Sequence, residues 1–189
     1  MSARYVAIDT ETAGFNAGSG ADPVNYPTEL AAVAYDPADG SIATLASTPI
    51  SGCRGIDAWA SAHTRHTVAS LAKAPNFEAA LRGLVAQLRD TDVLVFHHLE
   101  FDWNRVLRAH GGDEVAGLER LRRRCTMDGA LARALFPEEK GRRFKWPKLE
   151  ELCAALGEPF DGAGVHGAEY DAEAVARCVR AALGRGLSV

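Results

Sequence analysis

The stretch Tyr5-Val6-Ala7-Ile8-Asp9-Thr10-Glu11-Thr12 joins four apolar residues to a pair of acids two positions apart. The apolar run favours a strand buried on both faces, in the middle of an α/β sheet. Side chains two apart on a strand point the same way, so Asp9 and Glu11 share one side at the strand end. Close carboxylates raise each other's pKa, and a divalent cation removes that cost. Taken alone, the stretch is more simply explained as a turn that leaves a strand, with Glu11 in solvent.

Length and composition are those of a globular protein. The 189 residues predict one domain over 1–189, and the apolar and charged fractions of 47% and 24% are ordinary for a soluble chain. The sequence has no apolar stretch of membrane-spanning length and no apolar signal core, so a cytoplasmic location without a membrane partner is expected. The four cysteines form no CxxC pair, which favours reduced thiols over disulfides or a zinc site.

Positive charge is concentrated in one segment. The net charge is −4, but residues 120–148 hold ten Lys or Arg and three acids, a local charge of +7. A basic segment on an otherwise acidic chain can hold a polyanion at one place. The alternative is a solvated, Arg-rich helix and loop.

Apolar runs bounded by turn residues predict strands, and apolar residues at helical spacing predict helices. The turn sequence of residues 36–40 makes the first three strands an antiparallel meander. Strands are expected at 5–8, 29–35, 42–50 and 93–96. Helices are expected at 77–88 with Asn76 as cap, at about 101–110, and at 126–135, 148–156 and 168–183. Residues 13–27 are expected to form a loop and residues 137–147 a basic loop, whereas residues 51–75 are expected to be irregular or weakly helical.

Two further acids stand at helix starts. Asp102 follows the strand expected at 93–96, where an acid in the first helical turn also suits the helix dipole alone. Asp171 is the only charge on an apolar stripe of the last helix, a costly position unless the carboxylate is paired or binds metal. His166 precedes this helix in a Gly-rich loop that can bring it close, although a single loop histidine is more often at the surface.

Three motifs now stand in order along the chain. They are Asp9-Thr10-Glu11-Thr12, His97-His98-Leu99-Glu100-Phe101-Asp102 and His166-Gly167-Ala168-Glu169-Tyr170-Asp171. Their order and spacing resemble the DEDD superfamily of 3′–5′ exonucleases, in the DEDDh or DnaQ-like subgroup that carries a histidine in its third motif. The resemblance covers nearly the whole chain.

The resemblance implies a ribonuclease H-like α/β fold, a five-stranded mixed sheet flanked by helices. It implies that Asp9, Glu11, Asp102 and Asp171 hold two Mg²⁺ or Mn²⁺ ions in a two-metal hydrolysis. His166 would be the general base. The substrate would be the 3′ end of single-stranded DNA or RNA, released as nucleoside 5′-monophosphates.

Substrate contacts follow less directly. The resemblance places the chain around Thr10 and Thr12 near the terminal nucleotide, and the basic segment offers Arg142, Arg143 and Lys145 for phosphate contacts. His98 stands where the family often has Asn, and Ala13 where it often has Thr or Ser. His63 and His66 lie in the region that resembles a His-Gly loop of the family, and either could correspond to it.

Two other functions compete with an active exonuclease. One is a non-catalytic nucleic-acid-binding or adaptor module on the same fold, and the other is a ribonuclease H-type endonuclease. The presence of all five chemical positions disfavours the first, and His166 disfavours the second. The 18 residues after Asp171 predict no long polymerase-tethering tail, so a stable polymerase complex is not expected. DNA and RNA both stay open, because recognition of the 2′-hydroxyl depends on pocket geometry.

Overall fold

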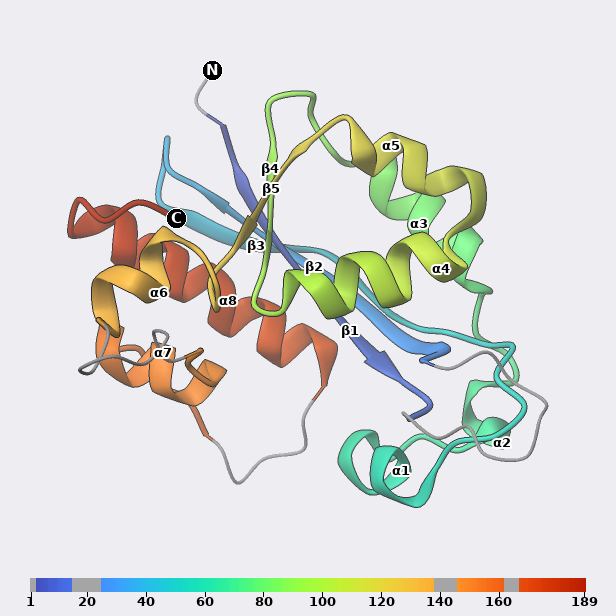
Figure 1. The fold of residues 1–189 in the computed structure, drawn as a ribbon. Coiled ribbons are helices and arrows are strands. Elements are labelled where there is room, and N and C mark those ends of the chain that lie inside the picture. Colours follow the sequence, from blue (N-terminus) through green and yellow to red (C-terminus); the bar gives the residue numbers. More distant parts are fainter. Residues whose placement is uncertain (1–2, 15–24, 138–145, 162–166) are drawn as a thin grey trace.

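The computed structural model describes residues 3–14, 25–137, 146–161 and 167–189. Its centre is a five-stranded sheet in the order β3-β2-β1-β4-β5 (Figure 1). β1 pairs with β2 and β2 with β3 in antiparallel fashion, whereas β1–β4 and β4–β5 are parallel. The prediction of a mixed five-stranded sheet is therefore confirmed. The strands are β1 Tyr5–Thr12, β2 Pro27–Asp36, β3 Ser41–Pro49, β4 Val93–Phe96 and β5 Arg122–Cys125.

The central strand β1 is longer than one of its neighbours. β2 pairs with β1 along its whole length, from Tyr5 opposite Tyr35 to Glu11 opposite Glu29. β4 pairs only with residues 5–7 of β1 and ends at Phe96. Within the part of the chain that the structure describes, the second half of β1 therefore has a hydrogen-bonded strand on one side only. The carboxyl end of parallel strands is where open sheets place their sites.

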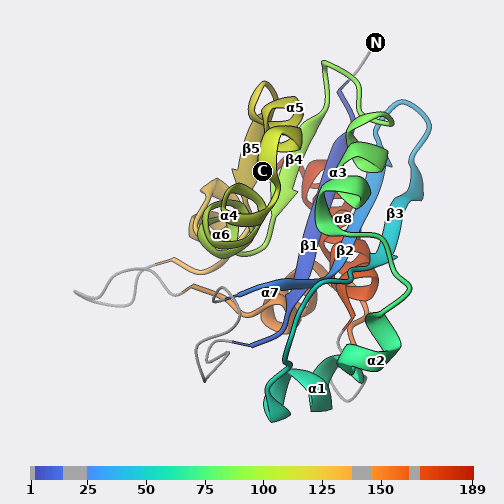
Figure 2. The same cartoon turned by 90° about the vertical axis from the view of Figure 1, so that its right-hand side faces the viewer.

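Helices cover both faces of the sheet (Figures 1 and 2). Asn76 caps α3 through its side chain, and Gly157 ends α7 in the left-handed conformation with φ 72°, as the sequence predicts. Among the described residues no helix has the length and apolar character needed to cross a membrane. The helices are α1 Ala58–Thr64, α2 Val68–Leu71, α3 Phe77–Val85, the π-helix η1 Glu100–Leu107, α4 Arg108–His110, the 3₁₀ turn η2 Gly112–Glu114, α5 Val115–Glu119, α6 Ala130–Leu135, α7 Leu149–Leu156 and α8 Ala168–Gly184.

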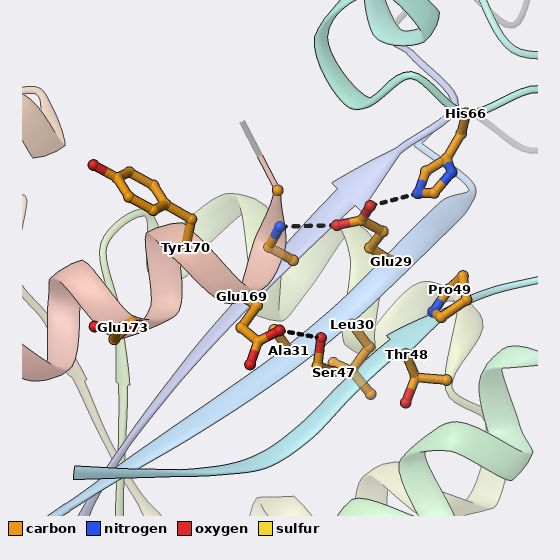
Figure 3. Close-up of a pocket in the computed structure, with 12 residues that line it drawn as sticks. Glu29, Leu30, Ala31, Ser47, Thr48, Pro49, His66, Glu169, Tyr170 and Glu173 are labelled. Atoms are coloured by element: carbon orange, nitrogen blue, oxygen red, sulfur yellow. Dashed lines mark hydrogen bonds and ion pairs between the residues drawn. The ribbon is translucent and has the colours of Figure 1, made fainter. Parts of the chain in front are cut away.

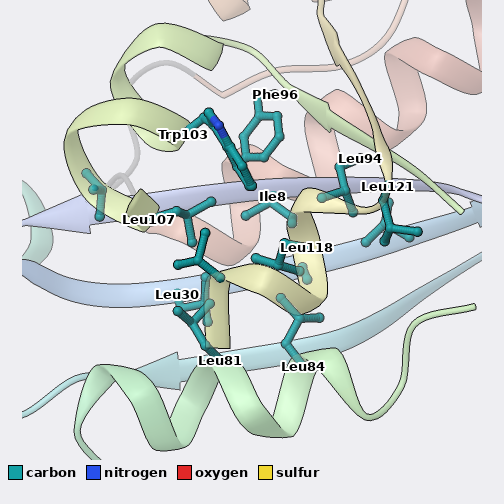
Figure 4. Close-up of a cluster of buried hydrophobic side chains, with 14 of the residues drawn as sticks. Ile8, Leu30, Leu81, Leu84, Leu94, Phe96, Trp103, Leu107, Leu118 and Leu121 are labelled. Atoms are coloured by element: carbon teal, nitrogen blue, oxygen red, sulfur yellow. The ribbon is translucent and has the colours of Figure 1, made fainter. Parts of the chain in front are cut away.

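The two faces of β1 have different cores. On one face, Ile8 belongs to a large cluster built with α3, η1 and α5 that includes Trp103 and Leu107 (Figure 4). On the other face, Ala7 packs with small residues of α8 such as Ala172 and Ala176. Because successive side chains alternate, Thr10 lies on the Ile8 face, and Asp9 and Glu11 lie on the α8 face.

The basic segment differs from its expected structure. β5 lies within it, where hydrophobic patterning indicates no strand, and α6 starts at Ala130 instead of residue 126. The reason is that β5 is an edge strand whose arginines do not need a core. Arg123 stacks its guanidinium over the Trp103 ring at 4.2 Å, while Arg122 and Arg124 are exposed. Thr126 then extends the pairing by donating its N–H to the Phe96 carbonyl at 2.9 Å.

Candidate metal centre

Three of the predicted acids meet at one point. Asp9, Glu11 and Asp171 each offer a carboxylate oxygen, and these oxygens lie within 4.8 Å of one another. The first two come from the α8 face of β1, and Asp171 comes from the first turn of α8, which packs across β1 and β2. Carboxylate oxygens at this separation can share one hard divalent cation such as Mg²⁺ or Mn²⁺.

Asp102 approaches from the opposite face of the sheet. It is buried in the first turn of η1, which begins soon after β4 ends. Thr10 points to that side of β1 and donates its hydroxyl to Asp102 Oδ1 at 2.8 Å. Asp102 is also the charge that acts most strongly on Asp9. Asp102 lies outside the group of three acids within 4.8 Å of one another, but it acts on Asp9 through its charge from the other helical layer.

The electrostatics of the site favour protons or cations. Burial is the main cause that raises the pKa of Asp9 well above its usual value, the pKa of Glu11 to about 8 and the pKa of Asp102 to about 7. Neighbouring carboxylates add to the effect at each group, and the hydroxyl of Thr10 works against it at Asp102. Metal-free acids here must repel one another or take up protons, so the donor set fits divalent metal ions.

Neither histidine of the second motif belongs to the acidic group of candidate metal ligands found among the described residues. His97 is linked through Nδ1 to the Thr126 hydroxyl at 2.9 Å, and burial lowers its pKa to about 4, so it is neutral. His98 stacks with Phe101 at a centroid distance of 6.0 Å. Together with Trp103 and Trp146 it lines a cavity of about 550 Å³.

Glu29, which the three motifs did not identify, is a neighbour of the site and forms an ion pair with His66 (Figure 3). Glu29 lies opposite Glu11 in the β1–β2 pairing. One of its oxygens pairs with His66 Nε2, and the other accepts the N–H of Ala168 at 2.9 Å. His63 instead packs against Trp59, with ring centroids 3.9 Å apart. The sequence shows Glu29 as the one acid in an otherwise apolar run of β2. Only the strand register of the structure shows that Glu29 faces Glu11.

The chain after Glu11 turns sharply. Ala13 is fully buried with Cys53 and Leu71, which explains why a small apolar residue fits there. Gly14 has φ 118°, and a Cβ at this position would lie 1.7 Å from Asp57 Oδ2. Asp57 in turn donates its backbone N–H to the Ala13 carbonyl and caps α1. The N-terminus of α1 is therefore fixed directly to the end of β1.

The remaining predicted residues divide into two groups. Thr10 and Thr12 are both buried at the end of β1, and the Thr10 hydroxyl is used by Asp102. Their predicted contact with a terminal nucleotide stays a prediction. His166, Arg142, Arg143 and Lys145 lie outside the described residues.

Comparison with known proteins gives a consistent result. The family model RNase_T, described as Exonuclease, matches residues 6–179. Exonuclease X, solved in complex with 5′ overhanging duplex DNA, is 24% identical with a TM-score of 0.61 over 97% of this chain and 94% of that chain. No curated protein sequence matches the chain.

Two further solved structures share the fold. A 3′-exonuclease solved for recognition of a histone mRNA stem-loop has a TM-score of 0.70 and 16% identity, over 98% of this chain and 84% of that chain. The nuclease domain of 3′hExo, a DEDDh family member bound to rAMP, has a TM-score of 0.65 and 15% identity, over 98% and 96% of the two chains. The predicted ribonuclease H-like fold is confirmed.

Proposed function

The chain belongs to the exonuclease family that the RNase_T model describes, and from this premise we propose that residues 1–189 form one metal-dependent 3′–5′ exonuclease domain. It would act on the 3′ ends of single-stranded nucleic acid. The observation that carries the proposal is the convergence of Asp9, Glu11 and Asp171 from two elements, with Asp102 supported by Thr10 beside them.

The residues present fit two Mg²⁺ or Mn²⁺ ions. When bound, such ions supply activation of the attacking water and charge stabilisation at the leaving 3′ oxygen. Asp9, Glu11, Asp102 and Asp171 would hold them. Because the pKa values of Glu11 and Asp102 are raised to about 8 and about 7, the empty site keeps protons near neutral pH that the cations must displace. Metal binding should therefore strengthen as the pH rises.

His166 would take the proton from the attacking water, as the resemblance implies. We expect His166→Ala to lower kcat by roughly 10²–10⁴, the usual contribution of a general base. Metal binding should persist, since His166 is not one of the acids. The measurement is kcat at neutral pH together with the rise in Tm on adding Mn²⁺. A variant with the wild-type rate would remove His166 from the mechanism.

DNA and RNA are both candidate substrates. The structurally similar proteins were solved with duplex DNA, with an mRNA stem-loop and with rAMP, which supports nucleic-acid 3′ ends as the substrate class. Arg142, Arg143 and Lys145 would contact phosphates, and their neutralisation should raise KM and flatten the dependence on salt. A stable complex with a polymerase is not part of the proposal.

The test uses single-stranded DNA and RNA labelled at either end, and a circular single strand. With Mn²⁺, 3′-labelled strands should release labelled mononucleotide at once, and 5′-labelled strands should shorten stepwise. EDTA should stop both reactions, and the circle should stay intact. Cutting of the circle would replace the proposal with an endonuclease. Binding without any hydrolysis would replace it with a nucleic-acid-binding or adaptor module.

A further inference from the structure

Resting on the proposed hydrolysis, we infer that Glu29 and His66 are positioning residues of the metal centre. Glu29 connects β2 to the first turn of α8 and to the loop between α1 and α2. It thereby fixes the separation of Glu11 and Asp171, which belong to different elements. Neither Glu29 nor His66 is one of the three clustered metal-ligand candidates of the described chain.

The strand register places Glu29 beside the site. Glu29 and Glu11 are directly opposite partners in the β1–β2 pair, and the register shifts immediately after Glu11. Directly opposite residues on one face have Cβ atoms about 4.5–5.5 Å apart. Glu29 is accordingly the charge with the largest effect on the pKa of Glu11. A fifth acid beside four others adds repulsion, so its presence calls for a compensating role.

That role begins at the N-terminus of α8. The residue before the helix, Gly167, has no side chain to satisfy the first N–H groups. Glu29 Oε2 accepts the Ala168 N–H at 2.9 Å from the neighbouring strand, and its negative charge also suits the helix dipole. Asp171 lies one turn later and donates its N–H to the Gly167 carbonyl at 3.2 Å. A movement of this turn relative to β2 would carry Asp171 away from Glu11.

His66 contacts the second carboxylate oxygen of Glu29. Its Nε2 pairs with Glu29 Oε1, and both side chains are about four-fifths buried, with exposures of 18% and 20%. The backbone around His66 is itself held, since its carbonyl accepts the Ser61 hydroxyl at 2.8 Å and its N–H is donated to the Thr64 hydroxyl at 3.2 Å. With both oxygens engaged, the Glu29 side chain has one orientation (Figure 3). Groups that orient metal ligands in this way typically change affinity or activity by roughly 10–100-fold when removed.

A second glutamate supplies a matched control. Glu169 follows Ala168 in the same turn and accepts hydroxyl hydrogen bonds from Ser47 at 2.7 Å and Thr44 at 3.0 Å. It joins α8 to β3 instead of β2 and is exposed. Glu169→Gln therefore removes one negative charge near the same end of α8 without touching the hydrogen bond between Glu29 and Ala168.

The experiment compares Glu29→Ala, Glu29→Gln, His66→Ala, His66→Gln, the double alanine variant and Glu169→Gln with the wild type. Two quantities are measured, the Mn²⁺ concentration that gives half-maximal rate and the rise in Tm that Mn²⁺ causes without substrate. We expect Glu29→Ala to raise the half-saturating Mn²⁺ concentration roughly 10–100-fold and to lower kcat, with little change in KM for the oligonucleotide. His66→Ala should act in the same direction, and His66→Gln, which keeps a donor, should recover part of the loss.

Because the two residues act as a pair, the double variant should resemble Glu29→Ala instead of showing the product of both effects. Glu169→Gln should match the wild type. Wild-type Mn²⁺ dependence in Glu29→Ala and His66→Ala would overturn the inference, as would multiplicative effects or an equal loss in Glu169→Gln. If the wild type binds Mn²⁺ but hydrolyses nothing, the proposed function fails. The thermal shifts alone then decide the positioning role.

Discussion

The two ends of β1 differ in how their buried charges are compensated. At its start, Arg4 is buried and its guanidinium contacts both oxygens of buried Asp92, at 3.1 and 2.7 Å. At its other end, Asp9 and Glu11 meet Asp171 and lie beside Asp102, and the charges that act most strongly on Asp9 and Glu11 are other carboxylates. An ion pair completed within the chain therefore lies just before the start of β1, and a cluster of like charges lies at its other end.

The pKa shifts of Arg4 and of the clustered acids have opposite meanings for the charged form. The hydrogen bond from Arg4 to Asp92 raises the pKa of the guanidinium, which means that the charged form is stabilised. At the other end, burial and repulsion raise the pKa of each carboxyl group, which means that the charged form is disfavoured. The chain supplies its own cation at one end, and cations from solution can stabilise the other. The first end contributes an ion pair to the fold, and the second offers a candidate cation site.

The largest expected effect is the loss of activity when one charge is removed from the cluster. Asp171→Asn keeps the shape of the side chain, so we expect the variant to be inactive. It should also be at least as stable as the wild type in EDTA, because repulsion is relieved. Mn²⁺ at a hundredfold excess over Kd should stabilise the wild type by about 2.7 kcal/mol and the variant by less. Melting curves of both proteins, in EDTA and in Mn²⁺, together with the hydrolysis rate, measure this.

If Mn²⁺ does not raise the Tm of the wild type, the acids do not form one repulsive metal site. The same conclusion follows if Asp171→Asn melts well below the wild type in EDTA. Asp171 would then be a structural partner of a cationic side chain. The two ends of β1 would resemble each other instead of differing.

At the start of β1, removing a charge is expected to lower stability and to leave catalysis unchanged. Asp92→Ala leaves the Arg4 charge buried without its partner, and breaking a buried pair in this way costs about 3–5 kcal/mol of folding free energy. The measurement is urea unfolding, with kcat determined at a temperature where the variant is folded. We expect the stability to fall while kcat per folded molecule stays near that of the wild type. Lost catalysis in a folded variant would show that the two ends are coupled.

The pH dependence of the metal-free protein sharpens the contrast further. Glu11 and Asp102 have folded-state pKa values of about 8 and about 7, above those of the unfolded chain. Their contribution to stability is therefore fully present below about pH 4 and is lost as the pH rises through 7 and 8. Each group contributes at most about 1.4 kcal/mol per pH unit. Tm in EDTA should fall between pH 6.5 and 8.5.

This range avoids an opposing contribution from His97. Its pKa is lowered to about 4, so it reduces stability only below its ordinary value of 6.5. Glu11→Gln with Asp102→Asn should flatten the curve, and saturating Mn²⁺ should do the same. A wild-type Tm in EDTA that rises over this range would mean that the acids are ionised and satisfied by the chain.

The smallest expected effect concerns Thr10. Its hydroxyl can support Asp102 through a hydrogen bond, or it can contact the substrate as the sequence predicts. Its hydroxyl lowers the pKa of Asp102, so Thr10→Val should move the acidic limb of the pH–rate profile upward by up to about one unit. Thr10→Ser keeps the hydroxyl and should behave as the wild type. A raised KM with an unchanged pH profile would instead support the predicted contact of Thr10 with substrate.

The sequence by itself predicted the parts of the site that depend on local pattern. The apolar run before Asp9 and the spacing to Glu11 describe a buried strand with two acids on one face, and β1 has this structure. The stripe that contains Asp171 predicted α8 closely, because helical periodicity is a property of neighbouring residues. The order of the three motifs then indicated the family, which the RNase_T match confirms.

Tertiary structure alone decided which residues surround these acids. β5 is a strand although its sequence is Arg122-Arg123-Arg124-Cys125, because an edge strand beside β4 needs backbone partners more than apolar side chains. Glu29 faces Glu11 and His66 only through the register of β1 and β2 and the course of a distant loop. Such contacts join residues far apart in the sequence. They depend on strand lengths and packing distances, which no local pattern encodes.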